Sequence, residues 1–136
     1  MIKVGIIGST GYAGGELARL LLQRDDIEIK WYGSRSYIGQ KYASLYPNMY
    51  KIVDEECMDD NMKELAGQVD VVFTATPQGL CASLVDEEIL SKVKIIDLSA
   101  DFRIKDVSVY EEWYKLTHAS PQFLEEAVYG LPEVNR

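Results

Sequence analysis

One stretch near the amino terminus, MIKVGIIGSTGYAGGELARLLL, constrains the fold of this chain more than any other. Its first part, Ile2 to Ile7, is an apolar run typical of a buried strand, and the part from Gly14 to Arg24 has the leucine spacing of an amphipathic helix. The glycines between them permit a tight turn and let an anionic group approach the positive end of the helix. Any sharp bend favours glycine, so the turn alone is weak evidence, but its position after the first strand strengthens it.

This turn, called the glycine turn below, has the pattern G-x-x-G-x-x-G in place of the commoner G-x-G-x-x-G. In a dinucleotide-binding fold, the corresponding turn holds the pyrophosphate of the cofactor. The residues that we expect to contact the cofactor here are Gly8, Ser9, Thr10, Gly11, Tyr12, Ala13 and Gly14.

Apolar, β-branched runs alternate with stretches of helical spacing along the rest of the chain, which is typical of a parallel α/β sheet. Further strands are expected at Ile27–Tyr32, Val69–Ala75 and Val93–Leu98, and helices at Met58–Ala66, Leu80–Leu90 and Tyr110–Tyr114. A long loop is expected at Gly33–Tyr50, a polar turn at Ser99–Val107 and an irregular tail after the last helix. The pattern predicts a Rossmann-like, doubly wound, mostly parallel sheet in a single domain over residues 1–136.

Composition narrows the class of partner. The chain has 136 residues, 47% of them hydrophobic, which is enough for one domain with a proper core. Its 14 Lys and Arg residues are scattered among 22 Asp and Glu residues, for a net charge of −8, which argues against a nucleic-acid partner. We find no long apolar run, and therefore expect no signal peptide, no membrane span and a cytoplasmic location.

The end of the second strand, Tyr32-Gly33-Ser34-Arg35-Ser36, bears on the choice of cofactor. An NAD-binding fold normally has an Asp or Glu there, which accepts from the adenosine ribose hydroxyls. This chain has Ser34 and Arg35 instead, and a guanidinium suits the 2′-phosphate of NADP, which a carboxylate would repel. The sequence therefore predicts NADP, with a merely solvated Arg35 as the alternative.

Two further strands end in polar turns, where open parallel sheets bind ligands. The turn TATPQG places Pro77, Gln78 and Gly79 after one strand, and it could equally be a plain strand-to-helix connection. The turn IDLSADFR places Ser99, Asp101 and Arg103 after the next. These three could orient a polar substrate, or Asp101 and Arg103 could form a local ion pair beside a capping serine.

No catalytic or metal-binding residue is expected among the remaining reactive side chains. Cys81 lies near a predicted helix start but between apolar neighbours, which favours a buried structural thiol, and acidic residues around Cys57 disfavour its thiolate. The two cysteines lack the spacing of a disulfide framework or a zinc site. We expect the lone His118 to be exposed or capping, and the aromatic stripe of Tyr110, Trp113 and Tyr114 to serve packing or an interface.

Together these segments resemble the N-acetyl-gamma-glutamyl-phosphate reductase family. The matching stretches are VGIIGSTGYAGGEL, GSRSYIGQ, TATPQG, IIDLSADFR, the WY within YEEWY, and AVYGLPEVNR. They span the whole chain in order, and IIDLSADFR with YGLPE-x-x-R is far more specific than any glycine motif. Two departures stand out: the family commonly has histidine at the position of Gln78, and its nucleophilic cysteine lies in an N-P-G-C-Y-P-T stretch downstream of Arg136.

The resemblance implies an NADPH-dependent reduction of an acyl phosphate to a semialdehyde in arginine biosynthesis, through a cysteine thioester. The chain then is the NADP-binding domain, inactive alone, of a protein whose second, catalytic domain is absent here; the full-length protein is expected to be a homo-oligomer. Ser9–Gly14 are implied to hold the pyrophosphate, Ser34 and Arg35 the 2′-phosphate, Pro77–Gly79 the nicotinamide, and Ser99–Arg103 to face the substrate. Alternatives are an aspartate-semialdehyde dehydrogenase and a regulatory protein that binds dinucleotide without catalysis.

Overall fold

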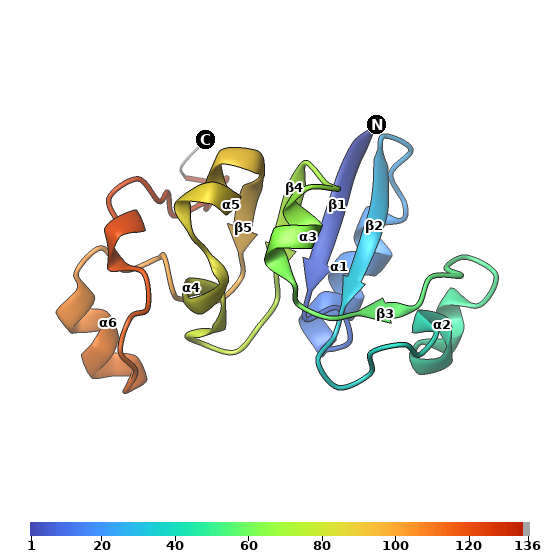
Figure 1. Ribbon diagram of the computed structural model, residues 1–136, viewed down its shortest axis with the longest axis horizontal. Helices are drawn as coiled ribbons and strands as arrows, with labels where there is room; N and C mark the ends of the chain where they lie inside the picture. Colours follow the sequence, from blue (N-terminus) through green and yellow to red (C-terminus); the bar gives the residue numbers. More distant parts are fainter. Residues whose placement is uncertain (135–136) are drawn as a thin grey trace.

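In the computed structural model, which describes residues 1–134, five parallel strands form one sheet (Figure 1). The strands are β1 (Ile2–Ile7), β2 (Ile27–Gly33), β3 (Cys57–Met58), β4 (Val71–Thr74) and β5 (Lys94–Asp97), in the spatial order β3-β2-β1-β4-β5. Every neighbouring pair is parallel, so the carboxyl ends of all five strands lie at one edge. The predicted doubly wound α/β class is confirmed.

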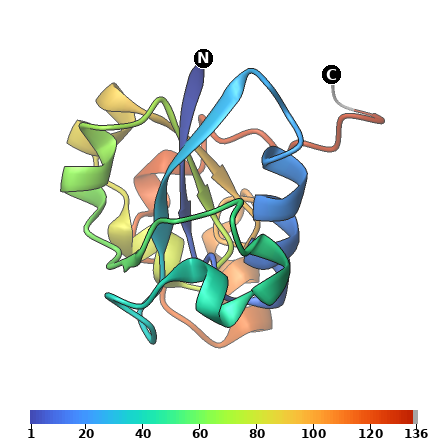
Figure 2. The same cartoon turned by 90° about the vertical axis from the view of Figure 1, so that its right-hand side faces the viewer.

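Helices cover both faces of the sheet (Figure 2). They are α1 (Tyr12–Leu21), α2 (Tyr42–Leu45), α3 (Met62–Ala66), α4 (Leu80–Leu84), α5 (Glu87–Lys92) and α6 (Val107–Tyr114), with short 3-10 turns at Pro47–Met49 and Pro121–Phe123. In the view of Figure 2, α1 and α2 lie on one side of the sheet, and α3 and α5 lie on the other. No helix among residues 1–134 is both long and apolar enough to span a membrane.

The central strand β1 joins the two apolar layers because its side chains alternate between the faces. Val4 and Ile6 pack in the layer that contains Leu21 of α1. Ile7 packs in the opposite layer with Leu65 of α3. Each of these side chains is buried, and full burial of one such side chain stabilises a fold by about 1.5–3 kcal/mol. The packing of β1 therefore fixes the position of the glycine turn that follows it.

The predicted helix Leu80–Leu90 is two helices in the structure. Val85 adopts an extended conformation and ends α4. Asp86 then caps α5, because its carboxylate accepts a hydrogen bond of 2.8 Å from the backbone N–H of Ile89. An Asp at this position accepts from a backbone N–H that would otherwise be unpaired at a helix start. This capping favours a second helix that begins after Asp86 over one continuous helix.

Other boundaries also differ from the sequence prediction. The first helix begins at Tyr12 and ends at Leu21, so Gly14 lies in its first turn. Met58 belongs to β3, and α3 begins only at Met62. Asn61 is the N-cap of α3, because its side chain accepts from the backbone N–H of Glu64. The predicted long loop after β2 contains α2 and a 3-10 turn, which the sequence reading missed.

Candidate dinucleotide-binding site

Three of the predicted ligand-binding segments meet at the carboxyl edge of the sheet. The glycine turn follows β1, the Ser34–Arg35 segment follows β2, and the turn Pro77–Gly79 follows β4. Since β1 lies between β2 and β4, the three turns are neighbours. The chain crosses from one side of β1 to the other between β3 and β4, and such a switch point is where open α/β sheets bind ligands.

Two glycines of the turn are required by close backbone contacts. Gly8 has a φ of +81°, and a Cβ atom on it would lie 2.2 Å from the carbonyl oxygen of Ala75. A Cβ atom on Gly14 would lie 2.0 Å from the carbonyl oxygen of Gly8. Neither position has room for a side chain, so the two glycines let α1 start directly against the end of β1.

Gly11 serves a different purpose, because the space around it is open. It is the N-cap residue of the ten-residue helix α1 and offers no capping side chain. A Cβ atom on Gly11 would meet nothing closer than 3.7 Å. Within residues 1–134, the backbone N–H groups of Tyr12, Ala13 and Gly14 have no acceptor. The first turn of α1 therefore presents open donors at its positive end, the chemistry that binds phosphate groups.

Ser9 and Thr10 connect the glycine turn to the end of β2. The buried Ser9 donates to the carbonyl oxygen of Gly33 from its backbone nitrogen, at 2.9 Å, and from its hydroxyl, at 3.0 Å. The hydroxyl oxygens of Thr10 and Ser34 lie 2.9 Å apart. The structure thus brings the two sequence motifs into direct contact, with the hydroxyls of Ser9 and Ser34 engaged inside the protein.

Arg35 extends from this junction towards solvent, with 63% of its side chain exposed. Its Nε atom lies 2.5 Å from Oδ2 of Asp60, which follows β3. In the described part of the chain, the two terminal nitrogens of Arg35 make no hydrogen bond. Arg35 is therefore paired through Nε with Asp60 and keeps its terminal nitrogens in solvent, so its role towards a 2′-phosphate stays a prediction. Asp60, which the sequence analysis missed, lies 25 residues away, and no local motif points to it.

The turn after β4 is tied to the turn after β5. Gly79 has a φ of +91°, and the Gln78 side-chain oxygen accepts a bond of 2.7 Å from the N–H of Ala100. Pro77 is exposed at the edge. Beside this turn, the buried hydroxyl oxygen of Thr76 has no hydrogen-bonding partner among the described residues. A buried hydroxyl of this kind is a free donor for a ligand group.

Asp101 lies in the interior, where it joins three elements. Its carboxylate accepts from the N–H of Gly79 at 2.8 Å, from the N–H of Ala82 at 3.0 Å and from the Tyr110 hydroxyl at 2.7 Å. The ion pair with Arg103 that the sequence allowed is not formed, because these partners occupy the carboxylate. The assignment of Asp101 to the substrate side stays a prediction.

The other two residues of this group lie on either side of Asp101. The Ser99 hydroxyl donates to Asp97 at 2.8 Å and accepts from the backbone of Asp101 at 3.2 Å, as a local capping serine does. The exposed Arg103 lies with its Nη2 atom 2.5 Å from the hydroxyl of Tyr114. Of the three, Asp101 is buried, Ser99 is half-buried and Arg103 is exposed, and their assignment to the substrate side stays a prediction.

Both cysteines are buried, free thiols. Burial raises the pKa of Cys81, with a further contribution from nearby Asp97, and burial also raises the pKa of Cys57. The pKa of Cys57 is thus raised mainly by desolvation, whereas the sequence had indicated the surrounding negative charge as the cause. A thiol held in its neutral form is a poor nucleophile, in agreement with the prediction that neither cysteine is catalytic.

The prediction that His118 would be exposed or capping is wrong as to exposure, since the residue is buried. Its Nδ1 atom accepts from the N–H of Ser120, and Nε2 lies 2.5 Å from the carbonyl oxygen of Asp101, which makes Nε2 the donor. The ring contacts Phe102 and Tyr110 edge-on. Among residues 1–134, no group of three His, Cys, Asp or Glu side chains is arranged to hold a metal ion.

The aromatic stripe of α6 divides between two environments. Tyr110 is fully buried, whereas 75% of Trp113 is exposed. Tyr110 and Tyr114 have ring centroids 5.2 Å apart. The prediction of a packing role is confirmed for Tyr110, and an interface role for Trp113 stays a prediction.

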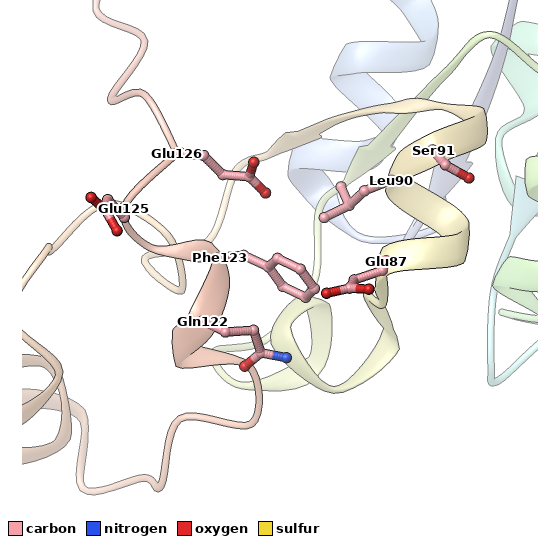
Figure 3. A pocket seen from close by; sticks show the side chains of 7 residues that line it. All are labelled: Glu87, Leu90, Ser91, Gln122, Phe123, Glu125 and Glu126. Carbon is pink, nitrogen blue, oxygen red and sulfur yellow. The ribbon is translucent and has the colours of Figure 1, made fainter.

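Two surface hollows lie away from the glycine turn, and the second of them includes Ser99 and Arg103 in its lining. One, of about 530 Å³, lies between α5 and the tail, and the carboxylates of Glu87, Glu125 and Glu126 line it (Figure 3). Another, of about 1140 Å³, lies along β5 and is lined in part by the half-exposed Ile96 and Leu98. The first is too acidic for a phosphate-bearing ligand, and the residues of the glycine turn line neither hollow.

Comparison with known proteins agrees with the motifs. Two relatives, both called N-acetyl-gamma-glutamyl-phosphate reductase, come from Lachnospira eligens and Lachnoclostridium phytofermentans. They are 72% and 68% identical to the chain over all 136 residues, which correspond to 39% of each relative. A relative of the same name from Campylobacter jejuni is 49% identical over 98% of this chain and 38% of its own length. The chain thus spans well under half the length of these curated relatives.

A solved structure shares the fold. The crystal structure of aspartate semialdehyde dehydrogenase with NADP from Candida albicans matches 79% of this chain and 32% of its own, with a TM-score of 0.59 and 20% identity. The family model described as "Semialdehyde dehydrogenase, NAD binding domain" matches residues 3–136, which includes Asn135 and Arg136 of the YGLPE-x-x-R motif, outside the described residues. The chain therefore belongs to the family of semialdehyde dehydrogenase NAD-binding domains.

Proposed function

We propose that this chain binds NADPH at the carboxyl edge of its sheet. The observation that carries the proposal is the set of open N–H donors in the first turn of α1, joined through the contact between Thr10 and Ser34 to the side chain of Arg35. The donors suit a pyrophosphate, and the terminal nitrogens of Arg35 suit a 2′-phosphate. The space at Gly11 and the orphaned hydroxyl of Thr76 also fit a ligand at this edge.

Within this proposal, the glycine turn Gly8–Gly14 holds the pyrophosphate, and Ser34 and Arg35 recognise the adenosine half. The turn Pro77–Gly79, beside Thr76, borders the nicotinamide. The loop Ser99–Arg103 faces the substrate, with Asp101 acting through the backbone of Gly79 and Arg103 reaching outwards. Bound NADPH supplies a hydride. The residues of this chain hold the cofactor and orient it.

The longer protein is proposed to reduce N-acetyl-gamma-glutamyl phosphate to the semialdehyde, with release of phosphate, in arginine biosynthesis. The relatives that match the whole chain carry the name of this reductase, which supports the proposal. In this reaction, a thiolate displaces phosphate from the acyl phosphate, and hydride transfer to the resulting thioester yields the aldehyde and returns the thiolate. Since Cys57 and Cys81 are buried, the thiol must come from outside these 136 residues.

The same proposal places the longer protein in the cytoplasm as a homo-oligomer acting on a small molecule. Two cysteines kept as free thiols fit a reducing compartment. The exposed indole of Trp113 on α6 is a candidate contact between subunits.

Calorimetric titration of the chain tests the cofactor proposal. We expect NADPH to bind at least tenfold more tightly than NADH, because the 2′-phosphate adds a charge-assisted contact. Equal affinities would remove the argument from Arg35, and no saturable binding of either nucleotide would remove the proposal. The reductase proposal is tested in the reverse direction, in which the N-acetylated semialdehyde reduces NADP⁺ in a phosphate-dependent reaction. The longer protein should catalyse this reaction, and this chain alone should show no activity.

A further inference from the structure

Two tyrosines from the segment after β2 reach back to the glycine turn. The hydroxyl of Tyr42 lies 2.7 Å from the carbonyl oxygen of Ser9 and donates to it. The hydroxyl of Tyr46 lies 2.8 Å from the carbonyl oxygen of Thr10 and 2.9 Å from that of Gly11. Three successive carbonyls of the turn are therefore contacted from one side by two hydroxyls that lie 33 to 36 residues further along the chain, and the Tyr46 hydroxyl shares its single proton between two of them.

The planarity of the peptide unit gives these contacts a consequence on the opposite side. In a trans peptide, the carbonyl of one residue and the N–H of the next point in opposite directions. The carbonyls of Ser9 and Gly11 belong to the peptide units that carry the N–H groups of Thr10 and Tyr12. Within residues 1–134, neither of these N–H groups has an acceptor. The Ser9 carbonyl is held by Tyr42, and the Gly11 carbonyl is held by Tyr46 together with the N–H of Gly15, which donates to it at 2.8 Å. These contacts fix the carbonyls on one side, which turns the open donors to the other.

Packing keeps the two tyrosine rings in place. Tyr42 is fully buried, with its ring centroid 4.6 Å from that of Tyr32 and 5.2 Å from that of Tyr46. A Cβ atom on Gly15 would lie 2.6 Å from the Tyr46 ring, so α1 has a glycine where that ring approaches. This contact accounts for Gly15, the last glycine of the opening stretch, which the turn itself does not require.

We propose that Tyr42 and Tyr46 are positioning residues, which hold the peptide planes of the glycine turn so that its N–H groups face the pyrophosphate of NADPH. The inference rests on the proposed cofactor site. The tyrosines act from the far side of the turn and touch no ligand. They therefore affect the binding of a pyrophosphate and leave the recognition of a 2′-phosphate unchanged. Burial raises the pKa of both hydroxyls, which keeps them protonated and able to donate at neutral pH.

The variant Tyr46→Phe tests this inference, because it removes the hydroxyl and keeps the ring against Gly15. Tyr50→Phe is the matched control, since Tyr50 lies in the same segment and is 71% exposed. We expect Tyr46→Phe to weaken NADPH binding about three- to tenfold, the effect of one hydrogen bond, and Tyr50→Phe to change it less than about twofold. Adenosine 2′-monophosphate, which lacks the pyrophosphate, should bind both variants and the unaltered chain equally.

A second readout needs no ligand. The ¹⁵N relaxation order parameters of Thr10, Gly11 and Tyr12 should fall in Tyr46→Phe and stay unchanged in Tyr50→Phe. Unchanged order parameters, or an equal loss of affinity for NADPH and adenosine 2′-monophosphate, would overturn the positioning role even if the unaltered chain binds NADPH. Failure of the unaltered chain to bind NADPH would instead overturn the cofactor proposal. It would also overturn the part of this inference that concerns the pyrophosphate.

Discussion

The hydroxyl oxygen of Thr10 lies 2.9 Å from that of Ser34, although the two residues are 24 positions apart in the chain. This contact joins the turn after β1 to the segment after β2 at the edge where both strands end. Open N–H donors of α1 are therefore close to Arg35, and a single dinucleotide can meet both. Neither motif is specific alone, but their contact joins them into one candidate site.

Substitution of Arg35 by Ala should weaken NADPH binding by about 1.5–3 kcal/mol, the range of a hydrogen bond to a charged group, and barely affect NADH. The reason is that the guanidinium is assigned to the 2′-phosphate, which NADH lacks. Arg24→Ala is the control, because Arg24 is an exposed arginine paired with a nearby aspartate, as Arg35 is. Isothermal titration of both variants with both nucleotides provides the measurement. An equal loss for NADPH and NADH would show that Arg35 does not recognise the phosphate.

Gly8→Ala should destabilise the fold by several kcal/mol, whereas Gly39→Ala should cost only about 1–2 kcal/mol. Both glycines have nearly the same positive φ, +81° and +82°, so both variants have the strain of a left-handed alanine. A Cβ at Gly8 also meets the backbone of Ala75 at 2.2 Å, while at Gly39 nothing lies within 4 Å. Urea denaturation gives both free energies of unfolding. Equal destabilisation would contradict the packed geometry of the glycine turn.

Asp101→Asn should destabilise the protein by about 1–3 kcal/mol, because one buried partner of the carboxylate is left unsatisfied. The carboxylate only accepts, whereas the NH₂ group of an amide cannot accept from Gly79, Ala82 or Tyr110. Asp106→Asn is the control: Asp106 caps α6 at the surface, where Asn caps equally well. Thermal unfolding monitored by circular dichroism would compare them. A Tm of Asp101→Asn equal to that of the control would mean that the buried network contributes little.

The free energy of unfolding should fall in alkaline solution. Burial raises the pKa of Tyr32, Tyr42 and Tyr110 above the ordinary value of 10.0, and the pKa of Cys81 above 9.0. A group whose pKa is raised in the folded state contributes its full stabilisation at pH values below its pKa in the unfolded state. This stabilisation is lost as the pH rises above that value. Each such group should remove up to about 1.4 kcal/mol per pH unit once the unfolded form ionises. Urea titrations from about pH 8 to pH 11 measure the loss, and equal stability across that range would contradict it.

The fold could be predicted, and a candidate site proposed, because the signals for both are local. Alternating apolar runs indicated a parallel sheet, the glycine turn indicated a pyrophosphate site, and the missing acid after β2 indicated NADP. The break between α4 and α5 also had a local signal, since Asp86 stands before two glutamates, a typical helix start. The helical spacing from Leu80 to Leu90 masked it.

The contacts that complete the site could not be predicted, because they join distant segments. Tyr42 and Tyr46 stood out in the sequence only as tyrosines in a long loop, and their hydrogen bonds to the glycine turn follow from how α2 packs on α1. Asp60 reaches Arg35 across 25 residues. The sequence allowed Asp101 either to orient a polar substrate or to pair with Arg103, yet the structure encloses it between α4 and α6.

The cofactor site can be mapped by titrating the ¹⁵N-labelled chain with NADPH and following each amide in the spectra. We predict saturable binding, with the largest shifts at the amides of Tyr12, Ala13 and Gly14 and at the segment Ser34–Arg35, and weaker binding of NADH. Saturable shifts confined to other parts of the chain, or no binding at millimolar NADPH, would contradict this prediction.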